Sequence, residues 1–265
     1  MSVRFHKNDL EKWAAFSGDY NPIHFEREAA ARLGLREIVV HGMLAMLPLK
    51  TSLETASAEH YPKGARWSAS LLNPVPLEAP SQAKVESGGA GGKAAFSLSS
   101  DAGATKFIKG AFSPASFDEA APAEKGDVTL VSAEEVAEKA REFRAAYPQA
   151  SRLWVFLDAL AFYLYVKRNS ENVFAVELRE HLARTGGPAQ AGHGDLLVVH
   201  ATHTVTIAPA LLRRPFAEPL PRFEYGVRGK DAIHNAGALF GVVEFSVYLD
   251  GAPSLLIEMG LMAKN

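Results

Sequence analysis

Hydrophobic and polar positions follow the same order in the two halves of the chain. Each half opens with an amphipathic helix, predicted over residues 8–16 and 133–147, and continues with a more apolar helix, predicted over residues 41–55 and 153–167. Strand-like segments follow each apolar helix. They are predicted over residues 66–72, 82–86, 196–207 and 223–228.

The strongest internal similarity joins two predicted β-hairpins. Residues 96–110 and 245–260 both read as a strand, a tight turn that contains Asp and Gly, and a returning strand. An apolar helix followed by hairpin-connected strands is typical of an α+β unit in which an antiparallel sheet wraps around one helix. We therefore predict two such units, at residues 1–117 and 130–265.

Three segments are predicted to lie outside these units. Residues 113–127 are rich in proline, alanine, serine and acids, and such a composition buries little apolar surface, so we place a linker at residues 118–129. The glycine-rich run at residues 88–93 does not fit the pattern of a phosphate-binding loop and is expected to be a hairpin loop. Residues 185–194 are likewise expected to form a loop and no site.

Composition narrows the class of protein. The chain has 265 residues, of which 48% are hydrophobic, so it can form a proper core. Its net charge of -2 argues against a general nucleic-acid-binding protein, and the absence of cysteine excludes disulfides, thiolate metal sites and cysteine nucleophiles. No signal-peptide pattern or bilayer-length apolar run is present. We expect a cytoplasmic globular protein with no membrane partner.

The residues that suggest chemistry begin at residues 16–24, which read Phe-Ser-Gly-Asp-Tyr-Asn-Pro-Ile-His. Asp19, Asn21 and Pro22 favour a turn, and the proline holds Asn21 in an extended conformation. Asp19 and His24 are too far apart, across a proline, to face each other along one helix. A rigid loop can instead direct both side chains at one small volume. A carboxylate and an imidazole that converge in this way form a general acid–base pair.

A second element, His41-Gly42, lies at the predicted start of the apolar helix. The first turn of a helix has unpaired N–H groups and the positive end of the helix dipole. Gly42 would let a ligand approach these donors, and a thioester carbonyl placed there would have its developing enolate charge stabilised. The two elements together predict proton abstraction next to a carbonyl, with loss or gain of water at the β carbon.

Residues 16–24, together with Val40-His41-Gly42-Met43, resemble the signature of the MaoC-like hydratase/dehydratase family, the (R)-specific enoyl-CoA hydratases. The resemblance is close over residues 9–50 and looser over the rest of the first half. It implies a hot-dog fold, in which an antiparallel sheet wraps around a central helix. With two units in the chain, the expected α+β fold is a double hot-dog, fused as a pseudo-dimer.

The resemblance also implies an activity, the reversible syn hydration of trans-2-enoyl thioesters to (3R)-3-hydroxyacyl thioesters. The acyl group would be carried by CoA or by acyl carrier protein. Asp19 and His24 would activate the water, Asn21 would orient the site, and the Gly42 amide would stabilise the oxyanion. No cofactor and no metal are implied. The resemblance also allows a homodimer of double hot-dog chains.

The second half lacks the Asp-x-Asn-Pro-x-His pattern, and no His-Gly pair precedes its apolar helix. It resembles the non-catalytic half of double hot-dog proteins, in which one repeat keeps the site. The order differs from that of the eukaryotic double hot-dog hydratases, which have the signature in the later repeat.

Several residues also have structural interpretations. Taken singly, Asp19 and His24 are typical of an Asx turn and a helix cap. His41 fits a structural cap as well as it fits a role in catalysis, so it is not among the four site residues. Pro48 is expected to kink or end its helix. Asp158, in the second apolar helix, is expected to have a hydrogen-bonded structural role.

Two other groups are not expected to form sites. His200 and His203 are three apart in a predicted strand, which places them on opposite faces and argues against a metal site. A basic cluster fits a solvated surface better than a phosphate-binding site. It comprises Arg213, Arg214, Arg222, Arg228 and Lys230.

Two functions other than hydration remain open. A hot-dog thioesterase would use the carboxylate to direct water at the carbonyl carbon, and would release free thiol. A binding or scaffold protein would associate with another acyl-chain enzyme or a carrier protein, and would turn over little substrate itself.

Overall fold

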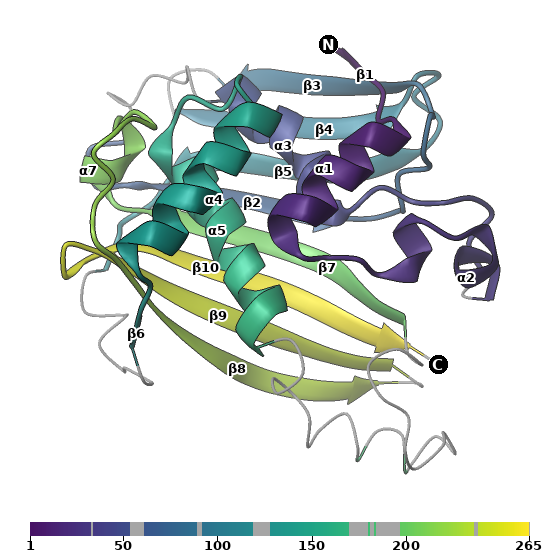
Figure 1. Cartoon of the computed structure of the whole chain (residues 1–265). Helices are drawn as coiled ribbons and strands as arrows, with labels where there is room; N and C mark the ends of the chain where they lie inside the picture. Colours follow the sequence, from purple (N-terminus) through teal and green to yellow (C-terminus); the bar gives the residue numbers. More distant parts are fainter. Residues whose placement is uncertain are drawn as a thin grey trace.

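The structure is a computed structural model that describes residues 1–32, 34–53, 61–88, 92–118, 128–169, 180, 183, 197–235 and 238–264. Within these residues, ten strands form one sheet in the order β1-β3-β4-β5-β2-β7-β10-β9-β8-β6. Every neighbouring pair is antiparallel. The helices lie against one face of this sheet (Figure 1).

The two halves of the sheet repeat each other about its central pair, β2 and β7. The first half comprises β1 (Ser2–Val3), β2 (Ala65–Leu71), β3 (Ser81–Gly88), β4 (Lys93–Ser100) and β5 (Lys106–Pro114). The second half comprises β6 (Thr129–Leu130), β7 (Leu197–Ile207), β8 (Phe223–Asn235), β9 (Ala238–Leu249) and β10 (Ala252–Lys264). The two predicted hairpins are β4–β5 and β9–β10, and they occupy equivalent places in the order.

The helices also repeat. The first half has α1 (Lys7–Ser17), the 3-10 helix η1 (Pro22–His24), α2 (Arg27–Arg32) and α3 (Gly42–Leu53). The second half has α4 (Ala133–Ala146), α5 (Leu153–Leu164), the π-helix η5 (Tyr165–Asn169) and α7 (Pro209–Leu212). α3 and α5 are the apolar helices, and most of their residues are buried. The predicted fold, an antiparallel sheet wrapped on central helices in two fused copies, is confirmed.

Aromatic side chains join the sheet to the helices. The Trp67 ring stacks on Phe96 with centroids 4.9 Å apart, and Trp154 of α5 stacks on Phe112 at 6.3 Å. Because Phe112 belongs to β5 and Trp154 to the second half, this contact crosses between the repeats. One continuous core therefore extends through both halves.

Pro48 does not end its helix, because α3 continues to Leu53. A proline inside a helix removes one N–H donor. The hydroxyl groups of Thr51 and Ser52 both donate to the carbonyl oxygen of Pro48, at 3.1 and 2.7 Å. The predicted end of this helix, residues 54–55, lies outside the described residues.

The expectation that His200 and His203 lie on opposite faces of β7 is wrong. Thr202 pairs with Gly260 and His200 with Leu261, so Ala201 is an extra residue, a β-bulge. A bulge shifts the alternation of side chains by one position. His203 Nδ1 and His200 Nε2 consequently lie 3.3 Å apart. Gly260 fits this bulge, since a Cβ there would lie 2.1 Å from Thr202 Oγ1.

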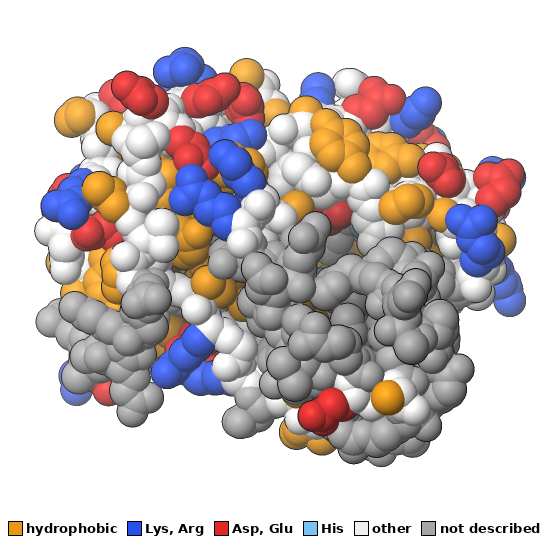
Figure 2. All heavy atoms as spheres, turned by 60° about the horizontal axis from the view of Figure 1, so that its bottom comes forward, with side chains coloured by type: hydrophobic (Ala, Val, Ile, Leu, Met, Phe, Trp, Pro, Cys, Tyr) orange, Lys and Arg blue, Asp and Glu red, His pale blue; other side chains and the backbone are white. Residues whose placement is uncertain are grey.

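Charges of both signs are interspersed over the face shown in Figure 2. In the basic cluster, Arg228 and Lys230 pair with the buried carboxylate of Glu244, and Arg222 pairs with Glu224. These pairs support the surface interpretation of the cluster. Among the described residues, no helix is both long and apolar enough to cross a membrane.

Parts of the predicted loops lie outside the described residues. These parts are residues 119–127 of the predicted linker, residues 89–91 of the glycine-rich loop, and all of residues 185–194. The boundaries of the two predicted units stay predictions.

Candidate active site

A series of hydrogen bonds between residues two apart in the sequence builds the loop that follows α1. Asp19 N–H donates to Ser17 Oγ at 3.2 Å, and Asn21 N–H donates to Asp19 Oδ1 at 3.3 Å. Asn21 Oδ1 in turn accepts from Ile23 N–H at 3.2 Å and caps η1. Asp19 and Asn21 therefore each form an Asx turn. Asn21 positions the short helix that ends in His24, which gives a physical basis for its predicted orienting role.

His24 is buried, and its hydrogen bond to Val39 shows which ring nitrogen carries the proton. Its Nδ1 lies 2.7 Å from the carbonyl oxygen of Val39, and a carbonyl only accepts, so Nδ1 carries the proton. Burial lowers the pKa of His24, although Asp19 and the Val39 carbonyl raise it in part. A neutral ring with its proton on Nδ1 has a lone pair on Nε2. His24 is therefore prepared to act as a base.

His41 lies in the same cluster, although the sequence left its role open. Its ring stacks on that of His24 with centroids 3.8 Å apart, and its Nε2 donates to the carbonyl oxygen of Asp19 at 3.0 Å. Burial and the neighbouring His24 lower the pKa of His41 to about 3. His41 Nδ1 is buried, and none of the described residues forms a hydrogen bond with it. The signal in the sequence was the His-Gly pair before an apolar helix.

Gly42 is the first residue of α3, as predicted, and its N–H belongs to the first turn, whose donors have no partner within the helix. A Cβ at this position would lie 2.7 Å from Leu71 Cδ2 and 3.7 Å from His200 Cβ. Leu71 and His200 therefore pack closely over Gly42. This packing is a reason for glycine here that the sequence did not indicate.

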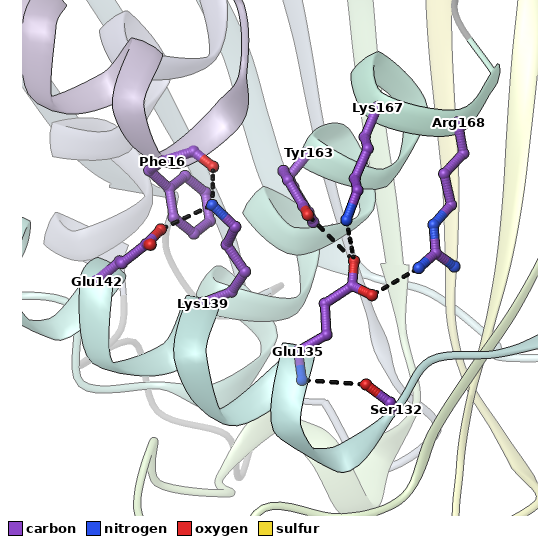
Figure 3. A network of polar contacts seen from close by, with 8 residues as sticks. All are labelled: Phe16, Ser132, Glu135, Lys139, Glu142, Tyr163, Lys167 and Arg168. Carbon is purple, nitrogen blue, oxygen red and sulfur yellow. Dashed lines mark hydrogen bonds and ion pairs between the residues drawn. The ribbon is translucent and has the colours of Figure 1, made fainter.

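Side chains of the second half hold the start of the loop that follows α1 (Figure 3). Lys139 Nζ of α4 donates to the carbonyl oxygen of Phe16 at 2.9 Å and to Glu142 Oε2 at 2.7 Å. The same ammonium lies 4.3 Å from the centroid of the Tyr163 ring. Phe16 is three residues before Asp19. The end of α1 is thus fixed by contacts from α4 and α5.

A second cluster in Figure 3 surrounds Glu135. Its carboxylate accepts from Tyr163 Oη at 3.1 Å, from Lys167 Nζ at 3.1 Å and from Arg168 Nη2 at 2.6 Å. Lys167 and Arg168 belong to η5. Cγ1 of Val166, the residue before Lys167, would lie 3.7 Å from a Cβ on Gly18. This cluster therefore holds the π-helix against the loop that follows α1.

Asp19, His24 and His41 are the described residues whose atoms could bind a metal ion together. Their ligand atoms lie within 4.8 Å of one another. An ion bound to an imidazole lies near the plane of the ring, and the two rings here are stacked with 29° between their planes. Stacked rings do not direct their lone pairs at one common point, so the arrangement favours acid–base chemistry.

A separate surface depression of about 430 Å³ lies outside this cluster. Its polar lining includes Ser68, Lys84, Glu86 and Lys109, from the first half of the sheet. None of the predicted site residues contributes to it.

Comparison with known proteins finds similarity in the part of the chain that contains the signature. Residues 1–102 match the model of the MaoC like domain. The chain is also 33% identical over 67 residues to a mitochondrial 3-hydroxyacyl-[acyl-carrier-protein] dehydratase of Arabidopsis thaliana. This match covers 25% of the chain and 38% of that relative.

Solved structures extend the similarity to the whole chain. A MaoC-like dehydratase superposes with a TM-score of 0.52 and 11% identity, over 98% of this chain and 95% of the other. A Mycobacterium tuberculosis protein described as having a double hotdogfold has a TM-score of 0.49 and 9% identity, over 99% and 94%. At an identity of 11%, the first similarity shows the fold. Residues 1–102 are therefore similar to a MaoC-like domain, in a chain that has the double hot-dog fold.

Proposed function

We propose that this protein hydrates trans-2-enoyl thioesters and dehydrates (3R)-3-hydroxyacyl thioesters, with one active site per chain. The observation that carries the proposal is the free lone pair of His24 Nε2 within a cluster that also holds Asp19. The start of α3, at Gly42, follows directly from His41 of the same cluster. A base, a carboxylate and a helix start are what addition of water next to a thioester requires.

In the hydration direction, Asp19 and His24 hold the water. His24 Nε2 takes a proton while the water oxygen bonds to C3, and the electrons of the double bond move toward the thioester oxygen. The Gly42 N–H stabilises the charge on that oxygen. The Asp19–His24 pair then returns one proton to C2, so that water adds across the double bond with no other reactant. Dehydration follows the same steps in reverse.

The names of the similar proteins support this class of reaction. They include a 3-hydroxyacyl-[acyl-carrier-protein] dehydratase and an (R)-hydratase from A. caviae. CoA and acyl carrier protein are therefore the proposed carriers. A cytoplasmic location and a homodimer of double hot-dogs stay predictions.

The test uses the purified full chain with crotonyl-CoA, longer enoyl-CoA thioesters and their acyl-carrier-protein counterparts. Loss of the conjugated enoyl absorbance, with formation of the (3R)-hydroxy product, is the expected result. Absence of turnover on the whole panel would contradict the proposal. So would release of free thiol as the main reaction, because that is the outcome expected of a thioesterase.

The residue assignment is tested separately with Asp19→Asn and His24→Gln. Each variant is expected to lose most of the activity. Asp101→Asn and His6→Gln are matched controls, since both side chains are exposed and lie outside the cluster. Wild-type rates in both Asp19→Asn and His24→Gln would overturn the assignment while leaving the activity itself in place.

A further inference from the structure

A chain of buried polar side chains leads from the centre of the molecule to the start of α3. Lys50 of α3 forms an ion pair with Asp158 of α5. Asp158 Oδ1 lies 2.8 Å from His203 Nε2, and His203 Nδ1 lies 3.3 Å from His200 Nε2. Lys50 Nζ also lies 4.7 Å from the centroid of the Trp67 ring. The chain crosses from the first half to the second and returns to Gly42.

The Lys50–Asp158 pair is fully enclosed. The side chains are 2% and 1% exposed, and transfer of either charge from water without the other would cost several kcal/mol. Burial alone would raise the pKa of Asp158, but Lys50 and His203 hold it well below its usual range. Asp158 is therefore a carboxylate that can only accept hydrogen bonds. The predicted structural, hydrogen-bonded role of Asp158 agrees with this geometry.

The carboxylate determines where the protons lie on both histidines. His203 Nε2 must carry a proton to donate to Asp158. Burial lowers the pKa of His203, so the ring is neutral and its Nδ1 is an acceptor. His200 Nε2 then donates to His203 Nδ1. Asp158 thus fixes the tautomer of His203 and, through His203, directs Nε2 of His200, whose ring is also held by a backbone hydrogen bond to Thr202.

The outer end of this chain lies against the proposed oxyanion donor. His200 Nδ1 and Cβ lie 3.8 and 3.7 Å from the point that a Cβ on Gly42 would occupy. The bulge at Ala201 makes this contact, because it places His200 on the same face as His203. The imidazole therefore covers Gly42 from the second half of the chain.

We propose that His200 is a positioning residue, held by the Lys50–Asp158–His203 chain, that fixes Gly42 at the start of α3 for the thioester oxygen. This inference rests on the proposed hydratase function. It gives the second repeat, which lacks the signature, a part in the site of the first. His200 acts through the Gly42 amide and needs no bond to the substrate.

The first experiment compares His200→Ala with Thr204→Ala, a control on the same strand whose side chain contacts Ser68. Hydration of an enoyl thioester is measured as kcat and KM, and folding is followed by thermal unfolding. His200→Ala is expected to lose about tenfold in kcat with little change in KM, because the oxyanion forms only as the reaction proceeds. If His200→Ala does not fold, His200→Gln, which is closer in volume, takes its place.

The second experiment changes the chain at its far end. Lys50→Met with Asp158→Asn removes both charges but keeps an oxygen that can accept from His203. Lys50→Met with Asp158→Leu removes the same charges and the acceptor. The double variant with Asp158→Asn is expected to keep a higher kcat than the double variant with Asp158→Leu. When His200→Ala is added to each, the two proteins are expected to have the same kcat.

The outcomes separate this inference from the function on which it rests. A wild-type protein that turns over no enoyl thioester overturns both. An active wild type, with His200→Ala folded and equal to Thr204→Ala in kcat, overturns only the role of His200. Equal kcat in the two double variants overturns the role of the buried chain.

Discussion

α3 and α5 occupy equivalent places in the two repeats, and they differ most at their first residues. α3 starts at Gly42, directly after His41, which stacks on His24. α5 starts after Arg152, whose guanidinium donates to the carbonyl oxygen of Arg213 at 2.9 Å. The N–H of Leu153, the first residue of α5, donates to the carbonyl oxygen of Arg214 at 3.0 Å. One helix start therefore lies beside imidazoles, and the other is paired with backbone.

The comparison shows which features the double hot-dog fold requires and which ones the site adds. Both core helices are apolar, buried and enclosed by an equivalent set of strands. Each core helix also contributes one charge to the buried pair, Lys50 from α3 and Asp158 from α5. Under the proposed function, the difference in chemistry comes from the loop that carries Asp19 and His24, and from the helix start that follows it.

The largest effect is expected at His24, in the loop that only the first repeat has. His24→Ala removes the base and should lower kcat/KM for an enoyl thioester by about 10²- to 10⁴-fold, which is the usual contribution of a general base. The measurement is the rate of enoyl hydration beside that of His6→Ala, whose histidine is exposed. Loss of less than about tenfold in His24→Ala would place the base elsewhere.

The second prediction concerns the buried ion pair between the two core helices. Asp158→Ala leaves Lys50 buried and unpaired, and should lower the free energy of unfolding by about 3–5 kcal/mol. Lys50→Met combined with Asp158→Leu removes both charges and should be more stable than Asp158→Ala alone. Denaturant unfolding of the three proteins measures the difference, and equal stability of the single and double variants would contradict the enclosed pair.

The repeated architecture could be predicted from the sequence, because helix and strand periodicities are local. Asp19, Asn21, His24 and Gly42 could be proposed as a site because they lie in two short segments. The structure brings Asp19 and His24 together, and the role of the four residues stays a prediction. The edge strands β1 and β6 are two residues long and have no periodicity to detect. A lone charge in each apolar helix was the available signal for the buried pair, since buried charges need partners.

The bulge in β7 could not be predicted, and the error over His200 and His203 follows from it. Strand alternation is a local rule, whereas this bulge depends on Gly260 of the neighbouring strand, where the missing Cβ leaves room for Thr202. The partnership of His41 with Asp19 also depends on tertiary packing. Asp19 and His41 meet only when the loop after α1 folds against the start of α3.

The third prediction uses the low pKa of the histidine that stands before α3. His41 has a pKa of about 3 in the folded protein and about 6.5 when unfolded. Its stabilising contribution is complete above pH 6.5 and is lost as the pH falls toward 3, because the unfolded chain takes up a proton that the folded protein excludes. Over that range the free energy of unfolding should fall by about 1.4 kcal/mol per pH unit for this group.

Denaturant unfolding at pH 7 and pH 5 measures this dependence. His41→Gln should reduce the dependence relative to the wild type, since glutamine does not titrate. An unaltered slope in His41→Gln would contradict the low pKa of this histidine.

The smallest effect is expected at the first helix of each repeat, where the two halves differ in how the helix begins. Ser132 Oγ caps α4 by accepting from Glu135 N–H at 3.2 Å, whereas α1 begins after His6, whose N–H donates to Asp9 Oδ2 at 2.8 Å. Ser132→Ala should cost about 1 kcal/mol of stability. Glu135 also holds η5 through Arg168, so loss of the Ser132 cap should lower the rate of enoyl hydration as well as the stability. Denaturant unfolding and the hydration rate of Ser132→Ala measure the two effects. An unchanged rate with lower stability would mean that the cap holds only α4.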